Sequence, residues 1–206
     1  MFQRLERRLR FLEATQGVPD GSRWVEQFGT PGSEMAANSV VLANGLIYMA
    51  GSVDWDVFVA CMDQEGALLW VKTHGTAAQE QMVAFVAVPS GLALVGTTTG
   101  AFNGTSGNAG GQDVFVLWLD MMGELQSTTQ FGSPSHDFAS DAAAATDFLY
   151  ICGVSGGALP NGEKGATGDA FLVQIDVNAP GIKKKKKKKK KESKKEERKK
   201  KGRRKN

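Results

Sequence analysis

Short apolar runs separated by glycine-containing turns recur along most of this chain. The first pair, residues 38–42 and 46–51, flanks the dipeptide Asn44-Gly45. Asn-Gly between two apolar runs predicts a two-residue hairpin, because a type I′ turn needs positive φ at both central residues. The next run, Val57–Met62, is apolar throughout and predicts a strand covered on both faces. A fourth strand is predicted at Leu68–Thr73, after a glycine turn.

This pattern occurs three times, and the third copy stops before its fourth strand. Each copy holds a segment that begins and ends with aspartate: Asp56–Asp63, Asp113–Asp120 and Asp169–Asp176. Within these segments one phenylalanine keeps the same slot and is predicted to be an equivalent core residue: Phe58, Phe115 and Phe171. The repeat length, counted from the first aspartate of one segment to that of the next, is 57 and then 56 residues. A repeat of this length indicates a propeller, a solenoid or an array. Four antiparallel strands in each repeat are typical of a propeller blade.

The order of these features carries a family resemblance. The motif Trp24-x-x-Gln27-Phe28-Gly29-Thr30, an acid five residues after the glycine, the apolar run that ends in glycine and the Asp-Val-Phe-Val segment together resemble the SBBP β-propeller repeat family. The resemblance covers Trp24–Asp176. It implies a fold but no activity, because the family has no defining catalytic residues. The chain departs from the family pattern in two ways. Its first repeat lacks a Gly/Asn-rich insertion, and its third repeat stops after Asp176.

The predicted architecture is an all-β chain, a β-propeller fragment of about three four-stranded antiparallel blades. The blades are expected at about 24–74, 75–131 and 132–182. Residues 1–23 are expected to form a basic amphipathic segment with a short helix, since the spacing of Phe2, Leu5, Leu9 and Leu12 places them on one helical face. Residues 183–206 are expected to form a disordered lysine-rich tail. Three blades do not make a usual ring, so self-association is expected.

Charge separates the body of the chain from its tail. Residues 1–182 hold 7 basic and 19 acidic side chains, whereas residues 183–206 hold 18 basic and 3 acidic ones. The tail repels itself and should stay unfolded. If the tail is part of the natural protein, it predicts binding to nucleic acid or to an anionic surface. The alternative is that the tail is the translation of a purine-rich stretch of nucleic acid that does not belong to the natural protein. The acidic body is not expected to bind nucleic acid by itself.

Acidic side chains recur at two positions in every repeat, and both positions fall in loops at the same end of the blades. They are Glu34, Asp56, Glu80, Asp113, Asp137 and Asp169. Such a set predicts a site for a cation, calcium in particular, or for a cationic ligand. The alternative is that each acid bonds nearby backbone N–H groups and stabilises its own turn. Repetition in every copy favours the alternative.

Two long loops are the candidate binding loops. One, Gly100–Asp113, contains Asn103 and Asn108, and the other, Gly156–Asp169, contains Asn161. Long loops on a rigid scaffold often carry function. They predict a protein- or glycan-binding module with an unidentified ligand.

Catalysis has little support in the sequence. His74 and His136 do not have metal-ligand spacing, and there is no Gly-x-Ser-x-Gly motif or P-loop. The chain is therefore expected to be non-enzymatic and without a cofactor, with a calcium-binding or hydrolytic propeller as the alternative. Cys61 and Cys152 are expected to be small buried apolar residues. No run is long enough to cross a membrane, and residues 1–14 lack the apolar core of a signal peptide, so the compartment stays unassigned.

Overall fold

The structure is a computed structural model that describes residues 6–9, 24, 26–29, 35–102, 107–159, 162 and 168–178. These residues form strands and no helix. The strands are β1 (Glu6–Leu9), β2 (Glu26–Gly29), β3 (Met35–Ala43), β4 (Leu46–Val53), β5 (Asp56–Met62), β6 (Leu68–His74), β7 (Glu80–Val88), β8 (Gly91–Thr98), β9 (Asp113–Leu119), β10 (Leu125–Phe131), β11 (Asp137–Ala144), β12 (Phe148–Ser155) and β13 (Asp169–Asp176). The predicted tail lies outside the described residues, as do Glu34, Asn103 and Asn161.

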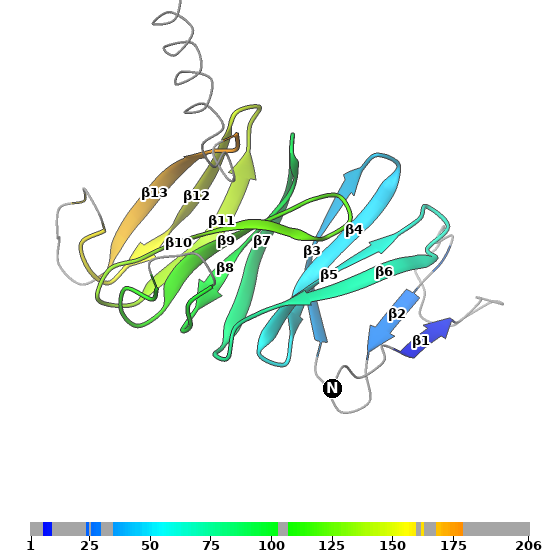
Figure 1. Ribbon diagram of the computed structural model, residues 1–206, viewed down its shortest axis with the longest axis horizontal. Helices are drawn as coiled ribbons and strands as arrows, with labels where there is room; N and C mark the ends of the chain where they lie inside the picture. Colours follow the sequence, from blue (N-terminus) through cyan, green and yellow to red (C-terminus); the bar gives the residue numbers. More distant parts are fainter. Residues whose placement is uncertain are drawn as a thin grey trace, which may run out of the picture.

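Three antiparallel sheets make up most of the fold (Figure 1). Sheet I has the order β3-β4-β5-β6, sheet II the order β7-β8-β9-β10, and sheet III the order β11-β12-β13. Every strand in a sheet pairs with its neighbour in sequence, as the repeat predicts. Sheet III has three strands in the described part of the chain, which agrees with the predicted end of the third repeat at Asp176.

The sheets stack face to face, with sheet II in the middle (Figure 1). One core cluster joins sheets I and II and includes Tyr48, Val59, Leu94, Phe115 and Leu117. A second cluster joins sheets II and III and includes Val95, Val116, Trp118, Leu149 and Ile151. Sheet II is therefore covered on both faces, which explains why β8 and β9 are buried at every position.

One cross-strand pair is the same in all three sheets. The phenylalanines Phe58, Phe115 and Phe171 lie opposite the glycines Gly51, Gly96 and Gly153. A Cβ atom on Gly96 would approach Cζ of Phe115 to 2.6 Å, so the ring occupies the space that a side chain would take. The predicted equivalence of the three slots is confirmed in register. Phe58 and Phe115 lie on interior strands and are buried, whereas Phe171 lies on the edge strand β13 and is half-buried.

The turns also follow the sequence signals. Asn44 and Gly45 have φ angles of 52° and 74°, as the predicted β3–β4 turn requires. Asp63 and Asp120 each accept two backbone N–H bonds in the turns that lead to β6 and β10. The glycine of each turn has positive φ and lies under a tryptophan of the preceding repeat: Trp24 covers Gly66 and Trp70 covers Gly123. Each of these tryptophans therefore packs one repeat against the next.

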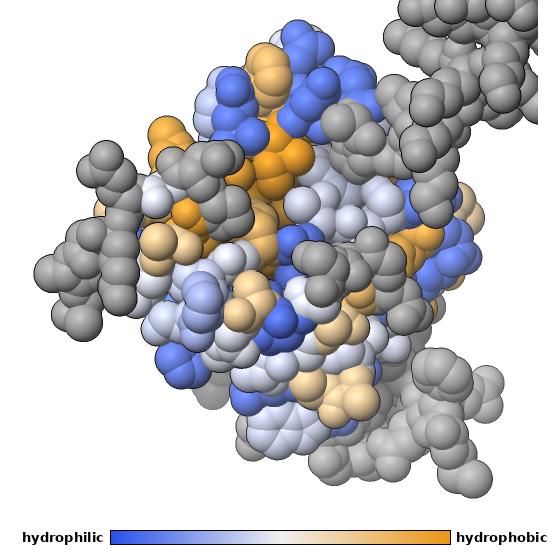
Figure 2. All heavy atoms as spheres, turned by 60° about the vertical axis from the view of Figure 1, so that its left-hand side comes forward, coloured by the Kyte–Doolittle hydropathy of each residue, from blue (hydrophilic) through white to orange (hydrophobic). Residues whose placement is uncertain are grey.

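Two expectations are wrong. The helix predicted in residues 1–23 is absent from Glu6–Leu9, which form β1 and pair with β2. A short helical pattern is marginal by itself, and pairing with another strand supplies the backbone bonds instead. Cys61 is buried as expected, but Cys152 is exposed. It lies on the outer face of sheet III, where Phe138, Val154 and Leu172 are also exposed and apolar side chains gather (Figure 2).

Candidate ligand-binding end of the sheet stack

Five connections emerge at one end of the stack, because successive antiparallel strands run in alternating directions. These are β4–β5, β6–β7, β8–β9, β10–β11 and β12–β13, and we call this end the loop end. Each described acid of the predicted set begins a strand there: Asp56, Glu80, Asp113, Asp137 and Asp169. The sequence therefore predicted correctly that these residues share one end.

Two of these acids stabilise their own loops. Glu80 accepts bonds from the backbone N–H of Thr76 at 2.8 Å and from the hydroxyls of Thr76 and Thr98, each at 2.7 Å. Asp137 repeats the arrangement: it accepts bonds from the backbone N–H and hydroxyl of Ser133, at 2.6 and 2.9 Å, and from the hydroxyl of Ser155. Both carboxylates are buried. This is the geometry that the turn-stabilising alternative predicts.

The structure also pairs acids from successive repeats across a glycine. A Cβ atom on Gly75 would overlap Oδ1 of Asp56 and lie 2.9 Å from Oε2 of Glu80. At Gly132 the same Cβ would overlap Oδ1 of Asp113 and lie 3.1 Å from Oδ2 of Asp137. Only glycine leaves room for both carboxylates at these two points. These four acids therefore form two separate pairs instead of one continuous rim.

The second pair is deeply buried. Oδ2 of Asp113 accepts bonds from the backbone N–H of Ala109 at 2.8 Å and from Nε2 of Gln130 at 3.1 Å. Oδ1 of Asp113 is buried and has no hydrogen-bond partner. The amide of Asn108 donates to the backbone oxygens of Gly100 and Gly111 and so joins the two described parts of the β8–β9 loop. Asn108, predicted as a binding residue, thus supports the loop from within.

The first and third repeats differ from the second. In sheet I, Met35 lies opposite Val53, the register position that Glu80 takes opposite Thr98 in sheet II. Glu34 and Glu80 each lie five residues after a glycine of their repeat, so the sequence aligns them with each other. Because Met35 takes the position of Glu80 in the structure, the pairing of β3 with β4 is displaced by one residue from that alignment. In sheet III, Asp169 begins β13 opposite Ser155 and is half-buried.

Backbone hydrogen bonds join each loop to the next repeat. The N–H of Glu80 donates to the carbonyl of Trp55 at 2.8 Å, and the N–H of Asp137 donates to that of Gln112 at 2.7 Å. The N–H of Thr99 donates to the carbonyl of Gln79 at 3.1 Å. The β4–β5 turn is therefore attached to the loop that enters sheet II, and its conformation depends on both sheets.

This attached turn presents an exposed tryptophan. Trp55 has 63% of its surface accessible and lines a pocket of about 460 Å³. The other lining residues are Asp54, Asp56, Thr76, Ala77, Ala78 and Gln79. A neighbouring pocket of about 390 Å³ shares Thr76 and Ala77 and is lined further by His74 and Phe102. An accessible ring above fixed polar groups can hold a ligand by stacking and by hydrogen bonds.

Two groups beside these pockets titrate abnormally. Burial raises the pKa of Asp56, and the neighbouring carboxylates of Glu80 and Asp54 raise it further, while His74 opposes the shift. Burial lowers the pKa of His74, although Gly123 accepts a hydrogen bond from its Nε2 atom. The carboxyl groups of Asp54, Asp56 and Glu80 therefore lie near one another beside the Trp55 pocket.

Sequence reasoning missed Trp55 and Gln79. The signal was a tryptophan between two acids in a turn, outside every repeated apolar slot. Within the described residues, no group of three or more His, Cys, Asp or Glu side chains is placed to hold a metal ion. No helix in the same part of the chain is long and apolar enough to span a membrane.

Comparison with known proteins gives no family assignment. No protein-family model matches the chain. It is 30% identical over 141 residues to the nitric oxide reductase transcription regulator NorR2 of Cupriavidus necator, a match that covers 62% of this chain and 27% of that protein. Because the chain spans about a quarter of that relative's length, the similarity does not show membership of its family.

Proposed function

We propose that this chain is a non-enzymatic binding scaffold made of three propeller-type blades, similar to SBBP repeats, and that its loop end holds a protein or glycan. Two observations support the blade assignment: each sheet contains consecutive antiparallel strands, and each packs face to face against the next repeat. Propellers stack their blades in this way and present loops at the ends.

Trp55 is the observation that carries the proposal. Tryptophan is enriched among the residues that anchor binding sites, because it supplies a large apolar ring together with one polar N–H group. Its turn is attached to sheet II through the 2.8 Å bond between Glu80 N–H and the Trp55 carbonyl. The backbone of the turn is therefore held in position before a ligand arrives, which reduces the entropy lost on binding.

Arrays of glycans and of peptides, probed with the full chain, test this proposal. The same arrays are probed with Trp55→Ala and with Met122→Ala, whose side chain is 60% exposed on the β9–β10 turn at the opposite end. Ligands should be retained by Met122→Ala and lost by Trp55→Ala. Binding that survives Trp55→Ala would contradict a site at the loop end. Release of new reducing ends or peptide termini from a bound ligand would contradict a non-enzymatic role.

A further inference from the structure

The ligand class of the Trp55 pocket follows from its charge, if the loop end binds a ligand as proposed above. Asp54 and Asp56 flank the ring in sequence and line the pocket, and Glu80 lies across Gly75 from Asp56. The neighbouring carboxylates of Asp56 and Glu80 repel each other, and partial burial strengthens the repulsion. A ligand that carries positive charge would relieve this repulsion, whereas a neutral ligand would leave it in place.

Within residues 35–102 and 107–159, which the structure describes, little positive charge lies near this site. Between Arg23 and Lys164 the sequence contains 14 acidic residues and one basic residue, Lys72. The charge of Lys72 is already engaged in an ion pair with Glu124. His74 borders the neighbouring pocket, and burial lowers its pKa, which favours its neutral form. The described side chains at the loop end therefore carry net negative charge, which attracts cationic partners.

The exposed ring distinguishes between kinds of cation. A tryptophan face attracts a guanidinium or ammonium group through its quadrupole, and it attracts arginine most often. The guanidinium is planar, weakly hydrated and able to bond a carboxylate through two N–H groups while it stacks on a ring. Calcium needs several oxygen ligands, and an aromatic ring supplies none. The combination of Trp55 with Asp54 and Asp56 thus suits arginine better than a metal ion.

We propose that the pocket formed by Asp54, Trp55, Asp56, Thr76 and Gln79 is a docking site for an arginine side chain on a basic segment of a partner protein. The guanidinium stacks on the indole of Trp55 and pairs with the carboxylate of Asp56. The side-chain amide of Gln79 and the hydroxyl of Thr76 supply further polar groups at the rim of the pocket. Arginine, and not the whole partner, is the chemistry that the pocket recognises.

A titration followed by NMR tests this proposal with the full chain. The probe is the blocked tripeptide Gly-Arg-Gly, and its control is Gly-citrulline-Gly, which has nearly the same shape but no charge. The chain has four tryptophans, so four indole N–H signals are expected, and the signal missing in Trp55→Ala identifies Trp55. The arginine peptide should shift the Trp55 signal saturably, while the citrulline peptide should not.

Variants separate the site from nonspecific attraction. Trp55→Ala and Asp56→Asn should each weaken the binding of the arginine peptide about tenfold, from the loss of the cation–π contact or of the paired charge. Met122→Ala should bind as the unchanged protein does. Equal binding of both peptides, or arginine binding unaffected by Trp55→Ala, would overturn the inference.

A neutral oligosaccharide, maltohexaose, separates failure of the inference from failure of the proposed function. If maltohexaose binds in a Trp55-dependent manner and the arginine peptide does not, the assignment of arginine is wrong while the loop end remains a binding site. If neither probe binds and no array ligand depends on Trp55, both proposals fail.

Discussion

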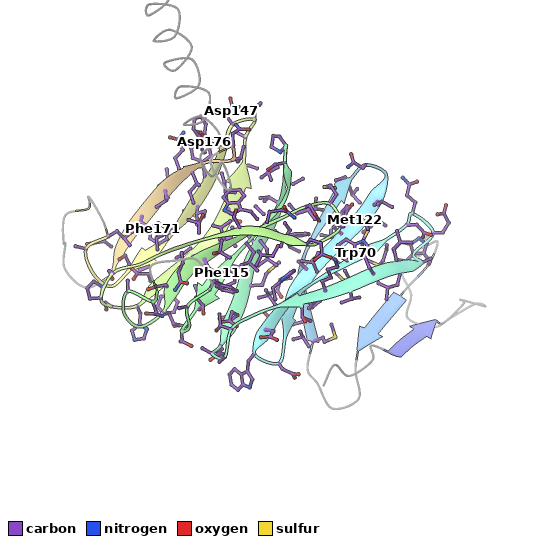
Figure 3. The ribbon with its side chains drawn as sticks, viewed as in Figure 1. Trp70, Phe115, Met122, Asp147, Phe171 and Asp176 are labelled. Carbon is purple, nitrogen blue, oxygen red and sulfur yellow. The ribbon has the colours of Figure 1, made fainter. Side chains whose placement is uncertain are left out.

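Substitution of Phe115 tests how much the packing between sheets I and II contributes to the free energy of unfolding. Its side chain is fully buried in the cluster between sheets I and II, beside Phe102 at 4.8 Å between ring centres, and its ring fills the space over Gly96 (Figure 3). A buried phenylalanine removes about 150–250 Å² from water, which at about 25 cal/mol per Å² is worth about 4–6 kcal/mol. Large-to-small substitution of phenylalanine costs about 3–5 kcal/mol. We expect Phe115→Ala to lower the free energy of unfolding by about 4 kcal/mol.

Urea denaturation followed by far-UV circular dichroism measures this loss. With a slope of about 2 kcal/mol per molar urea, the midpoint should fall by about 2 M. A loss of about 4 kcal/mol is a large part of the stability of an ordinary domain, so Phe115→Leu provides a milder variant, with an expected cost of about 1–2 kcal/mol.

The matched control is the equivalent residue of sheet III. Phe171 has the same register but is only half-buried, with an edge contact to Phe131 at 6.0 Å. Phe171→Ala should therefore cost less than half as much as Phe115→Ala. A loss below about 1 kcal/mol for Phe115→Ala would refute the packing of sheets I and II. Equal losses for the two variants would refute the difference in burial between them.

The other predictions concern the loop acid, the histidine, the tail and the open face. Glu80→Ala should cost about 2–3 kcal/mol in the same denaturation assay, because it leaves a buried hydroxyl unpaired. The lowered pKa of His74 means that the unfolded chain binds its proton more tightly; stability should fall as the pH drops below about 6.5, and His74→Phe should reduce that dependence in melts at several pH values. Deleting residues 183–206 should leave the melting temperature unchanged or slightly higher, since the segment has no apolar side chain to bury; an unfolded product would contradict this. Leu172, 71% exposed, should promote self-association that rises with concentration in light scattering, and Leu172→Glu should reduce it; a concentration-independent monomer would refute the role of this face.

Local sequence signals predicted most of the strands and turns. Local sequence is enough to predict the Asn44-Gly45 turn, the continuously apolar β5 and the aspartate-to-aspartate segments. The reason is that φ preferences and side-chain alternation act over a few residues. The three-fold repeat then placed the strands of one copy relative to those of the next. It also placed the recurring acids at one end, since antiparallel strands alternate in direction.

Long-range packing decided the rest of the candidate site. Nothing near Asp56 in the sequence shows that its carboxylate will meet that of Glu80 across Gly75, because the two belong to strands of different sheets. The exposure of Trp55 likewise depends on the loop that enters sheet II, to which its carbonyl is bonded. The displaced register of β3 shows the same limit: a one-residue shift in pairing changes which side chain takes the position of Glu80.

The same distinction explains the two wrong expectations. Cys152 lies in an apolar run like Cys61, but burial requires a neighbouring sheet as well as an apolar sequence. Glu6–Leu9 lie in a segment whose apolar residues have helical spacing, yet they pair with Glu26–Gly29. By itself, the sequence determined where strands begin, where they turn and which residues are equivalent, because these depend on local backbone preferences. Only the tertiary structure decided which faces are covered and which charges meet, because those depend on contacts between residues far apart in the chain.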